Sequence, residues 1–261
     1  MPETGNFLSI LRAGGVCLGA GISFTDPTVT EALSSVVDFL WIDMEHSPLS
    51  IEAVQAHVMA AKGSRATPLV RVAWNDPVLI KTVLDVGAAG IIIPMVRTAD
   101  EARRAVAACK YPPEGIRGFG PRRPTDYGRR GGPEYCRAAN ADVIVIPQIE
   151  HIDAVRNLDE IIKVPGITSL LIGPQDLAGS MGHMGEPQHP EVWAAIDTII
   201  EKARRAKMFV GAGTGGDPAK LAEWFKRGLH WLTVGNDYSL MLAAADAACQ
   251  RLRGEFPRAR E

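Results

Sequence analysis

The chain has few of the features that mark secreted, membrane-bound or nucleic-acid-binding proteins. Its four cysteines are scattered and form no CxxC pair, which favours reduced thiols. No apolar run approaches the ~18 residues that a membrane-spanning helix needs. The start of the chain lacks the basic residues and long apolar core of a secretory signal. A net charge of -2 leaves no basic excess for nucleic acid. We therefore expect a cytoplasmic protein with neither nucleic acid nor a membrane as its partner.

The length and composition are those of an ordinary globular protein. The 261 residues are enough for a large buried core. Apolar residues make up 46% and charged residues 22%, close to globular averages. Because no internal repeat or low-complexity linker divides the chain, we expect a single domain over residues 1–261.

Short apolar runs alternate with amphipathic stretches along the sequence. The runs are rich in Val, Ile and Leu without polar alternation, which is typical of parallel strands buried on both faces. The predicted strands are 15–22, 39–43, 67–72, 89–95, 141–150, 168–173, 208–213 and 231–236. Eight strands with about eight helices indicate an α/β protein with a TIM (β/α)8 barrel. A doubly wound open sheet is the alternative, but "GAGISF" after the first strand lacks the GxGxxG fingerprint of that fold.

Polar residues follow the carboxyl ends of several predicted strands, which is where barrel enzymes place their active sites. They are Asp43, Glu45, His46, Arg71, Gln148, Glu150, Asp176, Asn236 and Asp237. We therefore expect the active site at this rim.

Glu150 and Asp176 lie one strand–helix unit apart, so a barrel brings their carboxylates side by side. Such a pair repels unless one group holds a proton or a cation lies between them. A hard divalent ion that keeps water suits two carboxylates, so Mg²⁺, Mn²⁺ or Co²⁺ fits better than a structural zinc. The alternative is that either acid caps the next helix or pairs with an arginine.

Arg71 and His46 are the candidates for substrate binding and proton transfer. Arg71 ends an apolar strand, where its charge needs a substrate anion or a structural ion pair with Asp43 or Glu45. His46 follows a strand end, and Asp85 is a candidate partner that would orient it for base chemistry. Schiff-base chemistry is disfavoured because the lysines considered lie in predicted helices or loops: Lys81, Lys110, Lys163 and Lys207.

Several segments closely resemble the HpcH/HpaI aldolase family. They are "DFLWIDMEHSP", "VRVAWNDPVLIKTVLDVGAAGIIIPMV", "ADEARRAVAACKYPPEGIRG", "VIPQIE" and "LIGPQDLAGSMGHMGEPQHPEV", and they occur in the family's order over nearly the whole chain. The family consists of metal-dependent class II pyruvate aldolases, including the 4-hydroxy-2-oxoheptanedioate and 2-dehydro-3-deoxyglucarate types. The resemblance implies reversible cleavage of a 4-hydroxy-2-oxo acid to pyruvate and an aldehyde, with a divalent metal and no organic cofactor. Decarboxylation of oxaloacetate at the same site is the alternative activity.

The resemblance also implies roles for residues at the predicted rim. Glu150 and Asp176 match the metal ligands, and Arg71 matches the group that binds the pyruvate carbonyl or enolate oxygen. His46 matches the acid/base histidine, and Asp85 matches its carboxylate partner, which in the family crosses a subunit boundary.

Substrate contacts are implied at the helix start that follows the sixth strand. Backbone amides there would hold the pyruvate carboxylate, since free N–H groups at a helix start favour an anion. The substrate-binding residues implied, besides Arg71, are Gln148, Gly173, Pro174 and Gln175.

The resemblance also implies a homo-oligomer. Family members are commonly hexamers, built as trimers of dimers that exchange a C-terminal helix. The segment "YSLMLAAADAACQRL" suits that exchange, and it suits an ordinary final helix equally well.

Two segments depart from familiar family members. After "GIRG" the chain continues "FGPRRPTDYGRRGG", where Arg122 and Arg123 either bind a distal anionic group of the acceptor or face solvent or a neighbouring subunit. The segment "GAGTGG" (211–216) replaces bulkier apolar residues, which predicts a wider acceptor pocket.

Overall fold

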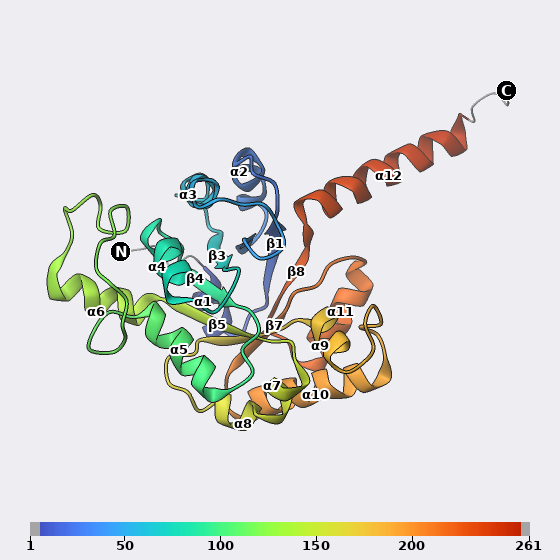
Figure 1. Ribbon diagram of the computed structural model, residues 1–261. Coiled ribbons are helices and arrows are strands. Elements are labelled where there is room, and N and C mark those ends of the chain that lie inside the picture. Colours follow the sequence, from blue (N-terminus) through green and yellow to red (C-terminus); the bar gives the residue numbers. More distant parts are fainter. Residues whose placement is uncertain (1–5, 257–261) are drawn as a thin grey trace.

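The computed structural model describes residues 6–256, whose strands form a closed parallel barrel (Figure 1). The strands are β1 (Cys17–Ile22), β2 (Phe39–Asp43), β3 (Thr67–Arg71), β4 (Gly90–Ile93), β5 (Ile144–Ile149), β6 (Ser169–Ile172), β7 (Phe209–Ala212) and β8 (Trp231–Asn236). They follow chain order around the barrel, and β1 pairs with β8 to close it. The predicted TIM barrel is therefore confirmed.

Most of the helices surround the barrel (Figure 1). They are α1 (Phe7–Arg12), α2 (Thr28–Ser34), α3 (Ile51–Ala60), α4 (Pro77–Asp85), α5 (Ala99–Cys109), α6 (Gly132–Asp142), α7 (Ile152–Arg156), α8 (Leu158–Ile161), α9 (Pro174–Ser180), α10 (Pro190–Arg205), α11 (Pro218–Arg227) and α12 (Asp237–Glu255). None of the helices within residues 6–256 combines the length and apolar character needed to cross a membrane.

Local sequence signals set several helix starts. Asp76 accepts the N–H groups of Val78 and Leu79, and Pro77 begins α4, where a missing N–H has no cost. Thr98 and Glu101 form a reciprocal capping box at the start of α5. These caps turn the chain from strand end into helix, so each helix starts beside the rim where the chemistry is expected.

The interior of the barrel changes from apolar to polar along the strands. Alternate residues of a strand share a face, so Phe39 and Trp41 lie below Asp43 on β2, and Leu69 lies below Arg71 on β3. Helix α1 closes the amino-terminal end, where Phe7 makes edge contacts with the rings of Phe39 and Trp231. The apolar layers thus support a polar layer at the carboxyl ends.

One predicted boundary was wrong. The strand expected over 141–150 begins only at Ile144, because helix α6 continues to Asp142 and Val143 caps it. Residues 111–131 form turns without a helix or strand and lead into α6, whose N-cap is Gly131. The remaining predicted strands match within about two residues, the usual uncertainty of such boundaries.

Candidate active site

Glu150 lies just past the end of β5 and is 2% exposed. Its Oε1 accepts the backbone N–H of Met95 at 2.7 Å, and its Oε2 accepts from the side-chain amide of Gln148. Burial raises the pKa of Glu150 to about 7. The hydrogen bond from Met95 lowers this pKa, whereas the negative charges of Glu45 and Asp176 raise it further. A buried carboxylate facing two other acids is a strong attractor for a cation.

Gly173 and Asp176 bring the start of α9 to the same place. An added Cβ at Gly173 would lie 2.6 Å from Glu150 Oε2 and 2.8 Å from Gln148 Nε2, so only glycine leaves room for these side chains. Asp176 lies exposed in the first turn of α9, and its charge raises the pKa of both Glu45 and Glu150. The structure therefore brings Gln148, Glu150 and Gly173 into contact, with Asp176 near enough for its charge to act on Glu150.

Two polar oxygens beside Glu150 lack a hydrogen bond within the described residues. Gln148 Oε1 and Glu45 Oε2 are both buried without a donor, although Glu45 Oε2 lies 3.1 Å from Arg71 Nη1 as a charge contact. Burial raises the pKa of Glu45, while the charge of Arg71 opposes the rise. Buried oxygens without donors are costly, and a divalent cation is one group that would satisfy them. The donor set consists of oxygens only, which suits a hard ion.

Arg71 is held in a fixed orientation by acids of the β2 end. Its Nε and Nη2 donate to the two carboxylate oxygens of Asp43 at 2.8 and 2.6 Å. The guanidinium also lies 4.9 Å from the centre of the Trp41 ring. The structural ion pair given above as an alternative role for Arg71 is therefore present, with Asp43 as the partner. The remaining nitrogen, Nη1, lies on the side of Glu45.

His46 and Asp85 are not brought together within one chain. The side chain of His46 is 63% exposed, and its nearest acid is Glu45, 3.8 Å from Nε2. Asp85 ends α4, which runs from the rim toward the amino-terminal end of the barrel, and there it pairs with Arg117 at 2.7 Å. A contact between His46 and Asp85 therefore requires a second copy of the chain.

Gln175 and Pro174 stand where the resemblance implies them, at the start of α9 after the cap Gly173. Asn236 and Asp237, by contrast, have structural partners. Asp237 Oδ2 accepts the N–H groups of Ser23 and Phe24, which ties the start of α12 to the segment after β1.

The prediction of a wider acceptor pocket at "GAGTGG" was wrong at Gly213. An added Cβ there would lie 2.9 Å from the ring of Trp41, so the indole already fills the space above the glycine. Trp41 also lies under Arg71 and forms the floor of the site. The small Gly213 just past β7 is compensated by the large Trp41 of β2.

Two site residues were missed by sequence reasoning. Met95 has a φ of 56°, unusual for a residue other than glycine, and this conformation accompanies the N–H bond to Glu150. Trp41 was treated only as part of an apolar strand. For Met95 the available signal was its position two residues after β4; for Trp41 it was the shared face with Asp43.

Among the described residues, a group of potential metal ligands also precedes α10. The ligand atoms of His183, Glu186 and His189 lie within 4.8 Å of one another. The two imidazoles are stacked with ring centres 3.5 Å apart, and His189 Nδ1 accepts the N–H of Glu191 as a helix cap. Stacked rings direct their lone pairs in parallel, which explains this group better as the capped start of α10.

Known proteins share this sequence and architecture. The family model described as HpcH/HpaI aldolase/citrate lyase matches residues 23–244. A 4-hydroxy-2-oxo-heptane-1,7-dioate aldolase of Salmonella dublin is 40% identical over 252 residues, covering 95% of both chains.

Solved structures agree. An HpcH/HpaI aldolase/citrate lyase family protein from Burkholderia cenocepacia superposes with a TM-score of 0.90 at 34% identity, over 96% of this chain and all of the other. An HpcH/HpaI aldolase from Desulfitobacterium hafniense gives 0.88 at 27% identity, over 97% and 98% of the chains. This chain belongs to the HpcH/HpaI aldolase/citrate lyase family.

Proposed function

We propose that this protein is a metal-dependent aldolase that reversibly cleaves 4-hydroxy-2-oxo acids to pyruvate and an aldehyde. Family membership makes it a carbon–carbon lyase. The observation that carries the metal-dependent mechanism is the buried Glu150, whose raised pKa reflects burial and neighbouring acids, beside a fixed arginine. No organic cofactor is needed for this reaction.

Glu150 and Asp176 are the proposed metal ligands, and Mg²⁺, Mn²⁺ or Co²⁺ the proposed ion. When bound, the ion would supply positive charge to the oxygen that becomes an enolate. Glu45 adds a third negative charge to the pocket, and Gln148 contributes an unpaired oxygen. The protein thus holds negative charge that a divalent cation neutralises.

Arg71 is the proposed enolate-stabilising residue. Its bidentate pair with Asp43 holds the guanidinium in place before substrate binds, so little reorganisation is needed as negative charge develops on the carbonyl oxygen. The N–H groups around Gln175 and Asp176, after the cap Gly173 and Pro174, would hold the carboxylate of the 2-oxo acid. Together these contacts orient the bond that breaks.

His46 is the proposed base for the C4 hydroxyl proton. Its exposed imidazole lies at the mouth of the site, and we propose that Asp85 of a neighbouring subunit orients it. Because Asp85 and His46 lie at opposite ends of the same barrel, the site is complete only in an oligomer.

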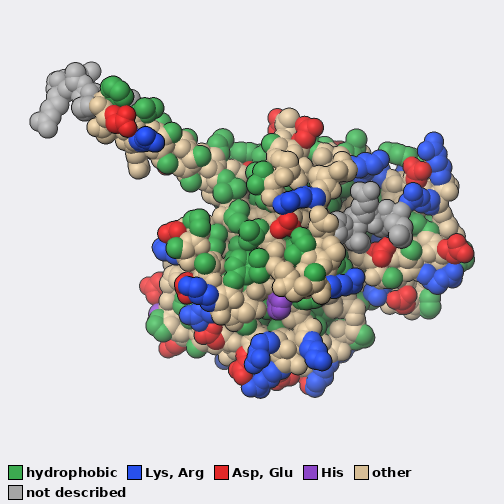
Figure 2. Space-filling view, turned by 180° about the vertical axis from the view of Figure 1, so that it is seen from behind, with side chains coloured by type: hydrophobic (Ala, Val, Ile, Leu, Met, Phe, Trp, Pro, Cys, Tyr) green, Lys and Arg blue, Asp and Glu red, His purple; other side chains and the backbone are tan. Residues whose placement is uncertain are grey.

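The C-terminal helix supports such an oligomer. Helix α12 extends away from the barrel (Figure 1), and Figure 2 shows hydrophobic side chains on its surface. Met241, Leu242 and Leu252 are more than half exposed, and burying them would be favourable. We propose that α12 is exchanged between subunits of a homo-oligomer, a hexamer built as a trimer of dimers.

Metal titration and turnover test the proposal together. We expect Mn²⁺ to bind the wild-type protein in calorimetry, and Glu150→Gln or Asp176→Asn to weaken binding strongly. Arg71→Lys should bind metal normally but lose about a hundredfold in kcat with 4-hydroxy-2-oxo acids, because the bidentate fork is lost.

Glu201→Gln, on the exposed face of α10, is the matched control and should behave as wild type. Normal metal binding by Glu150→Gln would contradict the assigned ligands. Turnover that survives complete chelation of metal would contradict the mechanism.

A further inference from the structure

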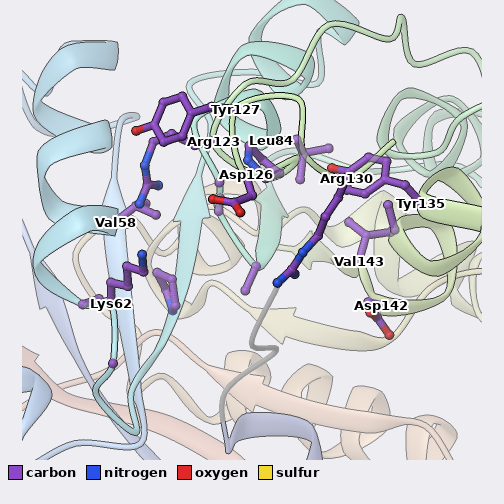
Figure 3. Close-up of a pocket in the computed structure, with 18 of the residues that line it drawn as sticks. Val58, Lys62, Leu84, Arg123, Asp126, Tyr127, Arg130, Tyr135, Asp142 and Val143 are labelled. Carbon is purple, nitrogen blue, oxygen red and sulfur yellow. The ribbon is translucent and has the colours of Figure 1, made fainter. Parts of the chain in front are cut away.

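The cavity in Figure 3 belongs to the face of the molecule at the end of α4, where we propose a subunit contact through Asp85. It lies between α3 and the segment 121–130, and Arg117, the partner of Asp85, lines it. Arg123 lines it as well, with its Nη1 donating to the carbonyl of Val86 at 2.7 Å. The candidate active site at the other end of the barrel differs, because one large side chain fills the space beneath its arginine.

That side chain is the indole of Trp41, which extends from β2 toward β7. Trp41 shares the interior face of β2 with Asp43 and is 6% exposed. Phe39 and Leu69, in the layer below it, are fully buried. An added Cβ at Gly213, just past β7, would lie 2.9 Å from Cη2 of the indole. Since β2 and β7 are not neighbours in the closed sheet, the outer ring of the indole crosses the barrel interior.

The indole contacts a face of the Arg71 guanidinium, while acids contact its edges. The central carbon of the guanidinium lies 4.9 Å from the centre of the Trp41 ring. Asp43 accepts from Nε and Nη2, and Glu45 lies 3.1 Å from Nη1. Two bonds to one carboxylate fix the edge of the guanidinium but still allow its plane to tilt. An aromatic ring against one face attracts the cation and limits this tilt, so the indole sets the plane in which the remaining N–H groups point.

We propose that Trp41 is a positioning residue for Arg71, and that Gly213 is small so that the indole can take this place. The inference rests on the proposed role of Arg71 in stabilising the enolate oxygen. An N–H donor stabilises a developing charge best when it points at the oxygen. A tilted guanidinium would therefore slow the reaction more than it weakens substrate binding. Trp41 acts through Arg71 and not on the reacting atoms.

Steady-state kinetics of the full-length, metal-loaded protein with a 4-hydroxy-2-oxo acid test this role. Trp41→Leu should lower kcat about tenfold and change KM less than about threefold, because the aromatic face is lost. Trp41→Phe keeps an aromatic face and should recover most of the loss. In an Arg71→Lys background, Trp41→Leu should have little further effect, since the group that it positions is gone. Trp224→Phe, at an equally buried tryptophan of α11, should keep the wild-type kcat.

Gly213→Ala tests the same contact from the other side of the barrel. The φ of Gly213 lies outside the left-handed region, so the backbone accepts alanine, but the new Cβ must displace the indole. We expect kcat to fall about threefold or more. Adding Gly213→Ala to Trp41→Phe should cause no further fall, because phenylalanine lacks the outer ring that reaches Gly213. Crystal structures should show the Arg71 guanidinium tilted in Gly213→Ala relative to the wild type.

The outcomes separate this proposal from the proposed function. A wild type that does not cleave 4-hydroxy-2-oxo acids would contradict the function, whereas the crystal structures would still decide whether Trp41 positions Arg71. The proposal fails if the guanidinium keeps its orientation in Gly213→Ala, or if Trp41→Leu costs as much in the Arg71→Lys background as alone. It also fails if the effects of Gly213→Ala and Trp41→Phe simply add, or if Trp224→Phe lowers kcat as strongly as Trp41→Leu.

Discussion

At the scale of single residues, the position of Glu150 depends on neighbours with no charge of their own. Met95 donates its backbone N–H to one oxygen, and Gly173 leaves space for the other. Neither residue would be chosen as functional from its chemistry, yet both act on the carboxylate proposed to hold metal. Supporting contacts of this kind commonly change metal affinity as much as tenfold to a hundredfold.

Gly173→Ala tests this support. The added Cβ would lie 2.8 Å from the Cβ of Glu150, so the carboxylate side chain must shift. We expect Mn²⁺ affinity in calorimetry to fall about tenfold or more, with a small change in melting temperature because the φ of -103° suits alanine. Gly120→Ala, which adds its Cβ to open space, should leave affinity unchanged. Wild-type affinity in Gly173→Ala would show that Glu150 moves without cost.

At the scale of elements, α2 and α3 meet through a buried histidine. His57 of α3 is fully buried, and its Nδ1 lies 2.8 Å from Thr30 Oγ1 of α2, while Nε2 has no partner within the described residues. Burial lowers the pKa of His57 below its usual 6.5. The backbone of Phe24 and the negative charges of Asp237 and Asp26 act in the opposite direction but are outweighed. The packing of these helices therefore requires a neutral imidazole.

This packing predicts a loss of stability in acid. The unfolded chain takes up a proton on His57 more readily than the folded one, so stability falls as pH drops below about 6.5. Melting temperatures between pH 7.5 and 5 should fall less steeply in His57→Gln than in wild type, whatever the starting stability of the variant. His46→Gln, which removes an exposed imidazole, is the control. Parallel slopes for His57→Gln and wild type would disprove this linkage.

At the scale of the whole molecule, a barrel with its own core carries a helix whose residues after Leu240 are all exposed within the described part of the chain. Asp237 anchors the start of α12, but along the remaining residues of the helix no side chain is buried. A helix of 19 residues is about 28 Å long, and most of the stability of helices in proteins comes from tertiary packing. A second copy of the chain is the proposed source of the missing contacts.

Charges placed on α12 should disrupt this assembly. We expect Met241→Asp combined with Leu252→Asp to lower the mass measured by light scattering after size exclusion, because a buried unpaired carboxylate is costly. The barrel should remain folded by circular dichroism. Gln250→Asp, on the same exposed helix, should keep the wild-type mass. An unchanged mass in the double variant would rule out α12 as the assembly contact.

The arrangement of the chain was readable from local patterns. Apolar runs without alternation indicated strands buried on both faces, and the barrel then placed Asp43, Arg71, Glu150 and Asp176 at one rim. The motifs of the family agreed with that placement. Periodicity and strand order are properties of neighbouring residues, so the sequence by itself determined the fold and the rim.

Contacts between distant segments were decided only by the tertiary structure. Trp41 fills the space over Gly213, Met95 donates to Glu150, and Arg123 donates to the carbonyl of Val86 at the end of α4. Each depends on side-chain direction and on the exact path of a loop, which no spacing rule specifies. Local sequence sets where strands end, whereas close packing across the barrel decides which side chains meet there.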